Sequence, residues 1–166
     1  MYDMQINLRC FSFSVLVLFL FLPSAAAKNG KLFIDFSLAS KHIDAGNEYN
    51  EINPGIGLSY FAGKNWEMRG GYYNNSYERP AFYLTANYVP VSADLKNFNF
   101  KPGIAAGFAT GYKDGELLVF GKSPILCESV VPVLAPNISV LFRPANARFV
   151  LLMLGNALAL QVSYLI

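Results

Sequence analysis

Apolar residues alternate with polar or small residues at a period of two along much of the chain after Lys28. In the segment LFIDFSLASKH, one alternating set is Leu32, Ile34, Phe36 and Leu38, and the other is Phe33, Asp35, Ser37, Ala39 and Lys41. The same alternation recurs at 66–73, 82–89, 97–108 and 158–166. Successive side chains of a β-strand point to opposite faces, and no stretch after Lys28 keeps a helical period over about ten residues. The sequence therefore predicts an all-β fold.

Residues 1–27 have the three-part layout of a secretory signal peptide. The segment MYDMQINLR ends in Arg9, the apolar run FSFSVLVLFLFLP follows, and the small residues SAAA precede Lys28. The apolar run has about a dozen residues, whereas a membrane-spanning helix needs about 20. We expect a signal peptide at 1–27 and one exported domain at 28–166, with a retained signal anchor as the alternative.

Cleavage would remove Cys10 and leave Cys127 as the one cysteine of the exported domain, so no disulfide can form within it. One histidine, His42, and one cysteine do not make a metal-binding cluster, and we expect neither a metal nor another cofactor. The formal net charge of +2 is too small to indicate a nucleic-acid partner.

Two all-β architectures fit this alternation. A soluble sandwich buries its apolar face, whereas a membrane barrel turns that face to lipid and lines its lumen with small or polar residues. Three features favour the barrel. The second face is rich in Gly, Ala, Ser and Asn, and the chain ends on an amphipathic strand that can pair with the first strand. Aromatic residues also gather near the expected strand ends, as at a membrane interface: Tyr60, Phe61, Trp66, Tyr72, Tyr73 and Tyr88.

We therefore expect an eight-stranded antiparallel transmembrane β-barrel. Its strands are predicted near 31–43, 54–61, 66–74, 80–90, 97–112, 117–142, 147–154 and 157–166. The long span 117–142 could also hold a loop followed by one strand. Turns at 62–65, 90–97 and 143–146 would lie at the periplasmic end, and those at 44–53, 74–80, 112–123 and 155–156 at the outer end. His42 and Ser76 would then share the outer rim, and Glu67 and Arg69 would face the lumen as a charge pair.

Three prolines interrupt expected strands: Pro54, Pro132 and Pro136. Proline lacks the N–H that a strand donates to its neighbour, so it is normally confined to sheet edges and bulges. A closed barrel has no edge, and a proline within a strand could open a gap that admits a lipid chain from the side. A bulge or a loop without such a function is the alternative.

Several short segments occur in an order that is similar to a known family: SKH (40–42), YNEINPGIGL (49–58), NW (65–66), NSYERPAFYLTANY (75–88), GIAAGFATG (103–111), VVPVLAPNISV (130–140) and GNALALQVSYLI (155–166). This order resembles the lipid A palmitoyltransferases of Gram-negative outer membranes, the PagP family. The resemblance covers nearly the whole exported domain, and its more specific parts are YNE after a histidine and the segment VVPVLAP.

The resemblance implies an enzyme that moves palmitate from a phospholipid to lipid A and measures the acyl chain in an apolar interior pocket. By position, the family's catalytic residues match His42, Asn75 and Ser76, and its prolines beside lateral lipid gaps match Pro54, Pro132 and Pro136. It also implies a protein of the cell outer membrane, with phospholipid and lipid A as partners and no cofactor, and we expect a monomer.

The chain departs from the family at several places. Asn75 stands where the family has aspartate, Ile166 replaces a final aromatic residue, and no amphipathic helix precedes the first expected strand.

Acyl transfer needs a proton acceptor that titrates near neutrality, and His42 is the one side chain of that type in the chain. Ser76 could supply a hydroxyl or bind the ester, and the amide of Asn75 could donate to an oxyanion. The nearby carboxylates that could orient the imidazole are Asp44, Glu51 and Glu78. Alternatively, Ser76 and Asn75 are turn residues. The protein would then be a non-catalytic small barrel with a surface or binding role, and a related acyl hydrolase is a further alternative.

Overall fold

The computed structural model describes residues 30–43, 49–113, 116 and 130–166. Its strands are β1 (Lys31–His42), β2 (Ile52–Ala62), β3 (Trp66–Asn74), β4 (Pro80–Tyr88), β5 (Ala93–Leu95), β6 (Phe98–Thr110), β7 (Val130–Phe142), β8 (Ala147–Leu154) and β9 (Ala157–Leu165). A short 3-10 turn, Arg143–Ala145, joins β7 to β8. Among the described residues, no helix has the length and apolar character needed to cross a membrane.

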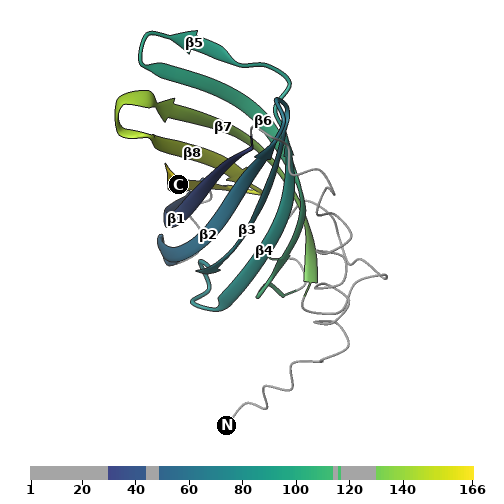
Figure 1. Ribbon diagram of the computed structural model, residues 1–166. Helices are drawn as coiled ribbons and strands as arrows, with labels where there is room; N and C mark the ends of the chain where they lie inside the picture. The colour runs from purple at the N-terminus through teal and green to yellow at the C-terminus, as the bar shows by residue number, and fades with distance from the viewer. Residues whose placement is uncertain (1–29, 44–48, 114–115, 117–129) are drawn as a thin grey trace.

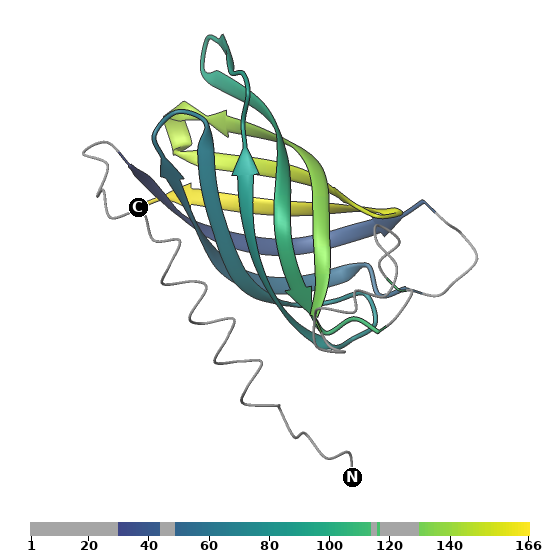
Figure 2. The same cartoon turned by 90° about the vertical axis from the view of Figure 1, so that its right-hand side faces the viewer.

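The strands form one antiparallel sheet that closes on itself (Figures 1 and 2). The order is β4-β3-β2-β1-β9-β8-β7-β6, and β4 also pairs with β6, which completes an eight-stranded barrel. The last strand pairs with the first, from Phe33 opposite Leu165 to His42 opposite Ala157. The short β5 pairs with β6 alone and extends past the rim of the barrel. The predicted fold, an eight-stranded antiparallel barrel, is confirmed.

Most predicted strands agree with the observed ones to within two residues at each end. Within the predicted span 117–142, the described strand β7 begins at Val130, and 117–129 lie outside the described residues, as does the predicted signal peptide. The prediction of a turn over 90–97 is wrong in part, because this segment contains the short strand β5. The turns at 62–65 and 143–146 share one end of the barrel, and those at 75–79 and 155–156 share the other, as predicted.

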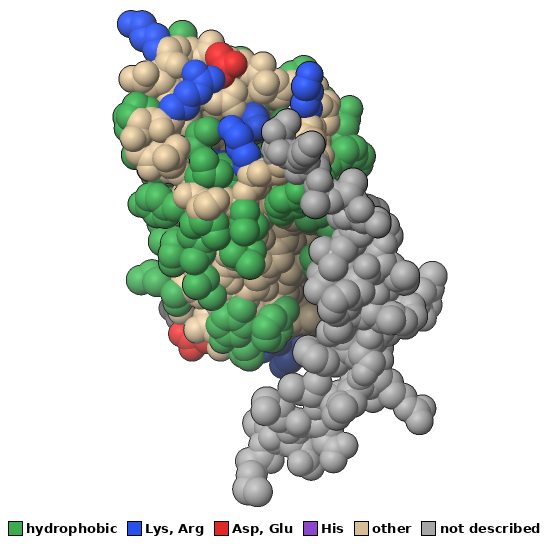
Figure 3. Space-filling view, viewed as in Figure 1, with side chains coloured by type: hydrophobic (Ala, Val, Ile, Leu, Met, Phe, Trp, Pro, Cys, Tyr) green, Lys and Arg blue, Asp and Glu red, His purple; other side chains and the backbone are tan. Residues whose placement is uncertain are grey.

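The two faces of the barrel wall differ in chemistry as the alternation predicts. Apolar side chains point outward and are exposed on the strands, including Phe36, Leu58, Phe82, Ile104, Phe108, Ile138, Phe149 and Leu151. Figure 3 shows hydrophobic side chains over much of one face of the barrel wall. Buried polar residues line the inside, including Asp35, Ser59, Glu67, Arg69, Asn87, Arg148 and Ser163. The barrel therefore has an apolar outer surface around a lumen with polar and charged side chains at its middle, unlike the wholly apolar core of a soluble sandwich.

Two of the six aromatic residues expected at an interface girdle are placed differently. Trp66, Tyr72 and Tyr88 are exposed on the outer surface. Phe61 is buried in the lumen, where its ring packs edge-on against Phe33 with centroids 6.1 Å apart. Tyr73 also points inward, and its hydroxyl lies 2.7 Å from the Tyr112 hydroxyl.

A network of charges occupies the middle of the lumen. Arg148 is 2% exposed and donates hydrogen bonds to Glu67, Asp35, Ser59 and Ser163. Arg69 is 1% exposed, its Nε lies 3.8 Å from Glu67, and it also donates to Gln161. The predicted lumenal pair of Glu67 and Arg69 is confirmed. The network contains two arginines and two carboxylates, so its formal charge is balanced.

A change of register in β1 decides which residues face the lumen at its end. Between Ser37 and Ala39, β1 advances two residues while the partner strand β9 advances one, from Gln161 to Leu160. This β-bulge breaks the alternation, so Ser40 is buried and Lys41 is exposed. A strict alternation from Phe33 onward would put Lys41 on the inward-facing side with Asp35 and Ser37. This prediction is wrong, because Leu38 is the extra residue of the bulge and shifts the side chains after it by one position.

Candidate functional site

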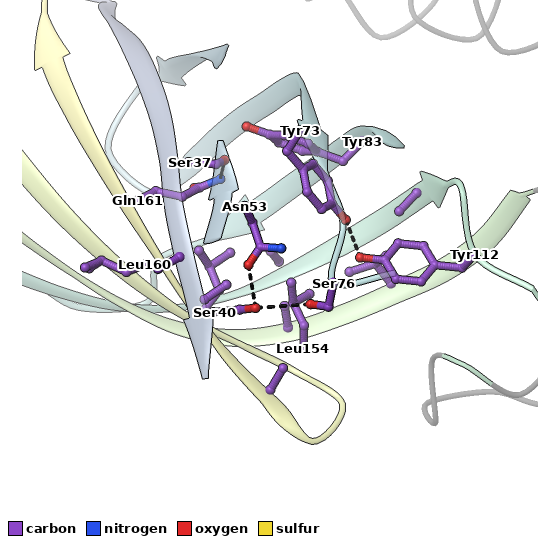
Figure 4. Close-up of a pocket in the computed structure, with 18 of the residues that line it drawn as sticks. Ser37, Ser40, Asn53, Tyr73, Ser76, Tyr83, Tyr112, Leu154, Leu160 and Gln161 are labelled. Atoms are coloured by element: carbon purple, nitrogen blue, oxygen red, sulfur yellow. Dashed lines mark hydrogen bonds between the residues drawn. The ribbon is translucent and has the colours of Figure 1, made fainter. Parts of the chain in front are cut away.

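The lumen beyond the charge network holds a cavity at the barrel end that carries His42 (Figure 4). About 90 Å³ of it is open to the centres of water molecules. Arg69 and Gln161 lie at its inner end, and His42, Ser76 and Asn156 lie at its mouth. The predicted site residues His42 and Ser76 therefore line one cavity, as expected for residues on a shared rim.

Small apolar side chains form much of the cavity wall. Five members of a buried cluster on β6, β7 and β8 line the cavity: Ala105, Ala109, Val133, Ala135 and Leu152. Alanine leaves space along the barrel axis that a larger side chain would fill, and this wall offers few hydrogen-bonding groups. The cavity can therefore hold an apolar chain, with polar groups at its mouth.

A chain of hydrogen bonds fixes the hydroxyl groups at the mouth. Ser40 Oγ donates to Asn53 Oδ1 at 2.6 Å, and Ser76 Oγ lies 3.2 Å from Ser40 Oγ. Asn53 Nδ2 donates to the backbone carbonyls of Asn50 and Asn74, which fixes the orientation of its amide. Because the Ser40 proton goes to Asn53, Ser76 is the donor to Ser40. Sequence reasoning missed Ser40 and Asn53, since the bulge in β1 is what turns Ser40 inward.

His42 is held by an aromatic ring. Its imidazole stacks on Tyr49 with centroids 3.8 Å apart and an angle of 12° between the rings. Its Nδ1 is buried without a hydrogen-bond partner among the described residues. Ser76 is bonded to Ser40, so the structure does not show the Ser–His pair of a hydrolase triad.

The predicted orienting carboxylates do not contact His42 where the structure describes them. Glu51 forms an ion pair with Lys41 at 2.6 Å, and Glu78 accepts a hydrogen bond from Asn50 at 3.4 Å. Asp44 lies outside the described residues.

Asn75 is fully buried beneath the turn that follows β3. Its Oδ1 accepts hydrogen bonds from the backbone N–H groups of Tyr77 and Arg79, both at 3.0 Å. Its Nδ2 donates to the Gly111 carbonyl at 2.7 Å. Asn75 is not one of the residues that line the cavity. In this structure the side chain shapes the turn that presents Ser76 and fastens that turn to the end of β6, as asparagine does in many turns.

Tyrosine rings surround the cavity mouth. Tyr77 packs edge-on against Tyr49 and Tyr112, with centroids 5.6 and 6.3 Å away. Burial raises the pKa of Tyr77 to about 12, and the neighbouring Tyr49 and Glu116 add to this effect. The Tyr77 phenol therefore stays protonated at neutral pH and can donate a hydrogen bond. The segment GGYYNNSYERP contains part of this cluster, but its sequence does not show which rings meet.

The prolines lie where the pairing of neighbouring strands is incomplete. β7 pairs with β6 along its whole length, including Pro132 opposite Phe108 and Pro136 opposite Ile104. Its pairing with β8 covers Asn137–Phe142 alone, so both prolines lie in the part of β7 without paired residues in β8. Pro54 lies where the register of β1 and β2 shifts, between the Gly55 and Ile52 pairs.

The fold and the cavity define a class: an eight-stranded antiparallel β-barrel with a partly apolar lumenal cavity that opens beside a histidine and serine residues. Neither the known protein-family models nor the curated proteins include a match to this chain. Within the described residues, no three histidine, cysteine or acidic side chains are grouped as a metal ion would require.

Proposed function

We propose that this protein is an outer-membrane acyltransferase that moves an acyl chain from a phospholipid to lipid A. The observation that carries the proposal is the cavity, which places His42 and Ser76 at the mouth of an alanine-lined lumen. A single acyl chain fits this arrangement, with its ester group at the rim.

The outer surface supports a place in a membrane. A belt of exposed apolar side chains surrounds the barrel, and Trp66, Tyr72 and Tyr88 add aromatic rings to the surface. Exposed apolar area of this extent is unfavourable in water, and it is favourable against lipid chains. With the mouth beside His42 on the cell surface, lipid A of the outer leaflet can reach it.

The depth of the cavity supports a limited acyl length. Ala157 at the mouth and Gln161 at the inner end are about 14 Å apart along β9 at ~3.4 Å per residue, or about 10 Å along the axis for a tilt of ~40°. An extended polypeptide advances about 1.1 Å per backbone bond, and an extended hydrocarbon has a similar zigzag. About nine bonds therefore reach Arg69 and Gln161. Palmitate, the acyl group that the family resemblance implies, would extend beyond this depth.

The proposed reaction is a direct transfer. A hydroxyl of lipid A attacks the ester carbonyl of the phospholipid while His42 takes the hydroxyl proton. Ser76 and Tyr77 line the cavity. Tyr77 can donate to the oxyanion of the tetrahedral intermediate, and Ser76 can do so once its hydroxyl rotates away from Ser40. The ester bond to the phospholipid then breaks, and the imidazolium returns the proton to the departing lysophospholipid oxygen. We do not assign Ser76 as the nucleophile, because it is hydrogen-bonded to Ser40.

The incomplete pairing in the barrel wall supports lateral entry of lipid. The gap between β7 and β8 at Pro132 and Pro136, and the register shift at Pro54, both lie at the His42 end of the barrel. A lipid chain that enters there reaches the cavity without passing through the charge network.

The test is mass spectrometry of lipid A and phospholipids from Gram-negative cells that lack their own lipid A acyltransferase and express this protein. We expect lipid A to gain the mass of one acyl group, and His42→Ala and Ser76→Ala to abolish or strongly reduce the gain. Lys113→Gln, an exposed substitution near the same end, is the matched control and should retain it. Heat-dependent migration in gels verifies that each variant forms the barrel.

Other outcomes would refute the proposal. Loss of acyl chains, or lysophospholipid without modified lipid A, would identify an acyl hydrolase. Unchanged lipids would favour a non-catalytic barrel.

A further inference from the structure

A second cavity opens at the other end of the barrel, beyond the charge network. About 370 Å³ of it is open to the centres of water molecules, which is far more than one water molecule needs. It lies between the β2–β3 turn, the segment 89–94 and the inner faces of β1, β6, β7 and β8. It shares no lining residue with the cavity beside His42.

Cations dominate the lining of this second cavity. They are Lys31, Lys64, Lys101, Arg143 and Arg148, and the one acidic residue in the lining is Asp94. Figure 3 shows Lys and Arg side chains gathered at this end of the molecule, near β5. The lining therefore carries far more positive than negative charge.

Existing ion pairs neutralise two of the five cations. Arg143 pairs with Asp94, and Arg148 pairs with Glu67 and Asp35 in the charge network. Within the described part of the chain, no carboxylate lies at ion-pair distance from Lys31, Lys64 or Lys101. Three ammonium groups thus line the same cavity without forming an ion pair with a described carboxylate.

Lys101 is placed in the cavity rather than in bulk water. Its side chain is half-buried on β6, and its Nζ lies 4.2 Å from the centre of the Phe61 ring. Next to it, Arg148 is 2% exposed, and its Nε is buried without a hydrogen-bond partner. A cation that has lost part of its hydration interacts more strongly with an incoming anion than an exposed cation does.

We propose that this cavity is a binding site for a small phosphate-bearing anion. A phosphate group offers several acceptor oxygens and more than one negative charge, which matches three ammonium groups. The cavity is larger than one phosphate ion requires, so it can take an organic phosphate ester with its phosphate towards Lys101. Such a phosphate could be that of a soluble metabolite or that of a phospholipid headgroup. The proposal does not depend on acyl transfer at the opposite end.

The test is calorimetric titration of the folded barrel, in zwitterionic detergent at low salt, with glycerol 3-phosphate and with inorganic phosphate. We expect binding of glycerol 3-phosphate that weakens as salt is added. Lys101→Gln should weaken it by about tenfold, the effect of removing one charge-assisted hydrogen bond, and Lys64→Gln with Lys101→Gln should weaken it further. Lys113→Gln removes the same charge at the opposite end and should leave the affinity unchanged.

A second arm separates the two sources of phosphate. The titration is repeated in nanodiscs of phosphatidylglycerol and of phosphatidylcholine. If glycerol 3-phosphate binds in phosphatidylcholine nanodiscs but not in phosphatidylglycerol nanodiscs, an anionic lipid headgroup occupies the site. Binding in both lipids would show a site for soluble phosphate esters. The proposal is wrong if glycerol 3-phosphate does not bind, or if the Lys64 and Lys101 variants bind it as tightly as the Lys113 variant.

Discussion

Replacing Glu67 by glutamine should destabilise the barrel strongly. Glu67 is 1% exposed, and its carboxylate accepts hydrogen bonds from Arg148 and from Asn87, the latter at 2.9 Å. Its other charged neighbour is Arg69, at 3.8 Å. The substitution keeps the size of the side chain and removes one of two negative charges that balance two buried arginines. Removing one partner of a buried ion pair typically costs about 3–5 kcal/mol, and we expect Glu67→Gln to cost about that much.

The measurement is equilibrium unfolding in urea, followed by the fluorescence of the single tryptophan, Trp66. Trp66 is 52% exposed on the outer surface of β3, so its emission should change when unfolding moves the indole ring from the surrounding detergent or lipid into water. Glu78→Gln is the matched control, because Glu78 is exposed and has one long hydrogen bond. It should change the free energy of unfolding by less than about 0.5 kcal/mol.

A double variant tests whether charge balance is the cause. Glu67→Gln combined with Arg148→Gln leaves Arg69 and Asp35, 3.9 Å apart, as one balanced pair. The double variant should therefore be more stable than the sum of the two single effects predicts, by about 2 kcal/mol. The reasoning is refuted if Glu67→Gln behaves like Glu78→Gln, or if the two single effects are additive.

Three further predictions concern the site and the wall. Gly107→Ala should destabilise the barrel by about 1–3 kcal/mol, because its Cβ would lie 2.0 Å from a β4 carbonyl oxygen. Gly70→Ala, whose Cβ would meet its nearest atoms at 3.5 Å, should have little effect in the same urea titration. Asn75→Asp should lower stability by about 1–3 kcal/mol and should not raise activity, because aspartate cannot donate the hydrogen bond that Asn75 Nδ2 makes; a rise in the lipid A mass gain would contradict this. Pro132→Ala with Pro136→Ala restores two backbone donors in the part of β7 that has no paired residues in β8 and should slow acyl transfer without loss of folding, and unchanged transfer would argue against entry there.

The barrel was predictable because its wall obeys one simple rule. Outward-facing and lumen-facing positions must alternate in every strand, and closure demands that the last strand can pair with the first. The segment that ends at Ile166 meets that demand in its sequence alone. The bulge in β1 was not predictable in the same way, because Leu38 is as apolar as its outward-facing neighbours and nothing marks it as the extra residue.

The candidate site was predictable in part. The sequence and its family resemblance indicated His42 and Ser76, and the structure places both at one cavity. The resemblance also implied a catalytic role for Asn75. In the structure, the Asn75 side chain makes three hydrogen bonds, and all of them are with backbone groups. The lysine-lined cavity was not visible in the sequence, since Lys31, Lys64 and Lys101 come from distant parts of the chain and meet only when the barrel closes.

The charge network in the lumen has a consequence for permeability. A barrel wall alone would enclose a passage from one end to the other, but Arg69 and Arg148 reach across the lumen to carboxylates on other strands, Arg69 to Asp35 and Arg148 to Asp35 and Glu67. A solute would have to separate these pairs in order to pass. We therefore expect planar bilayers containing the folded protein to show no steady ionic current, and each mouth to exchange solutes only with its own side of the membrane.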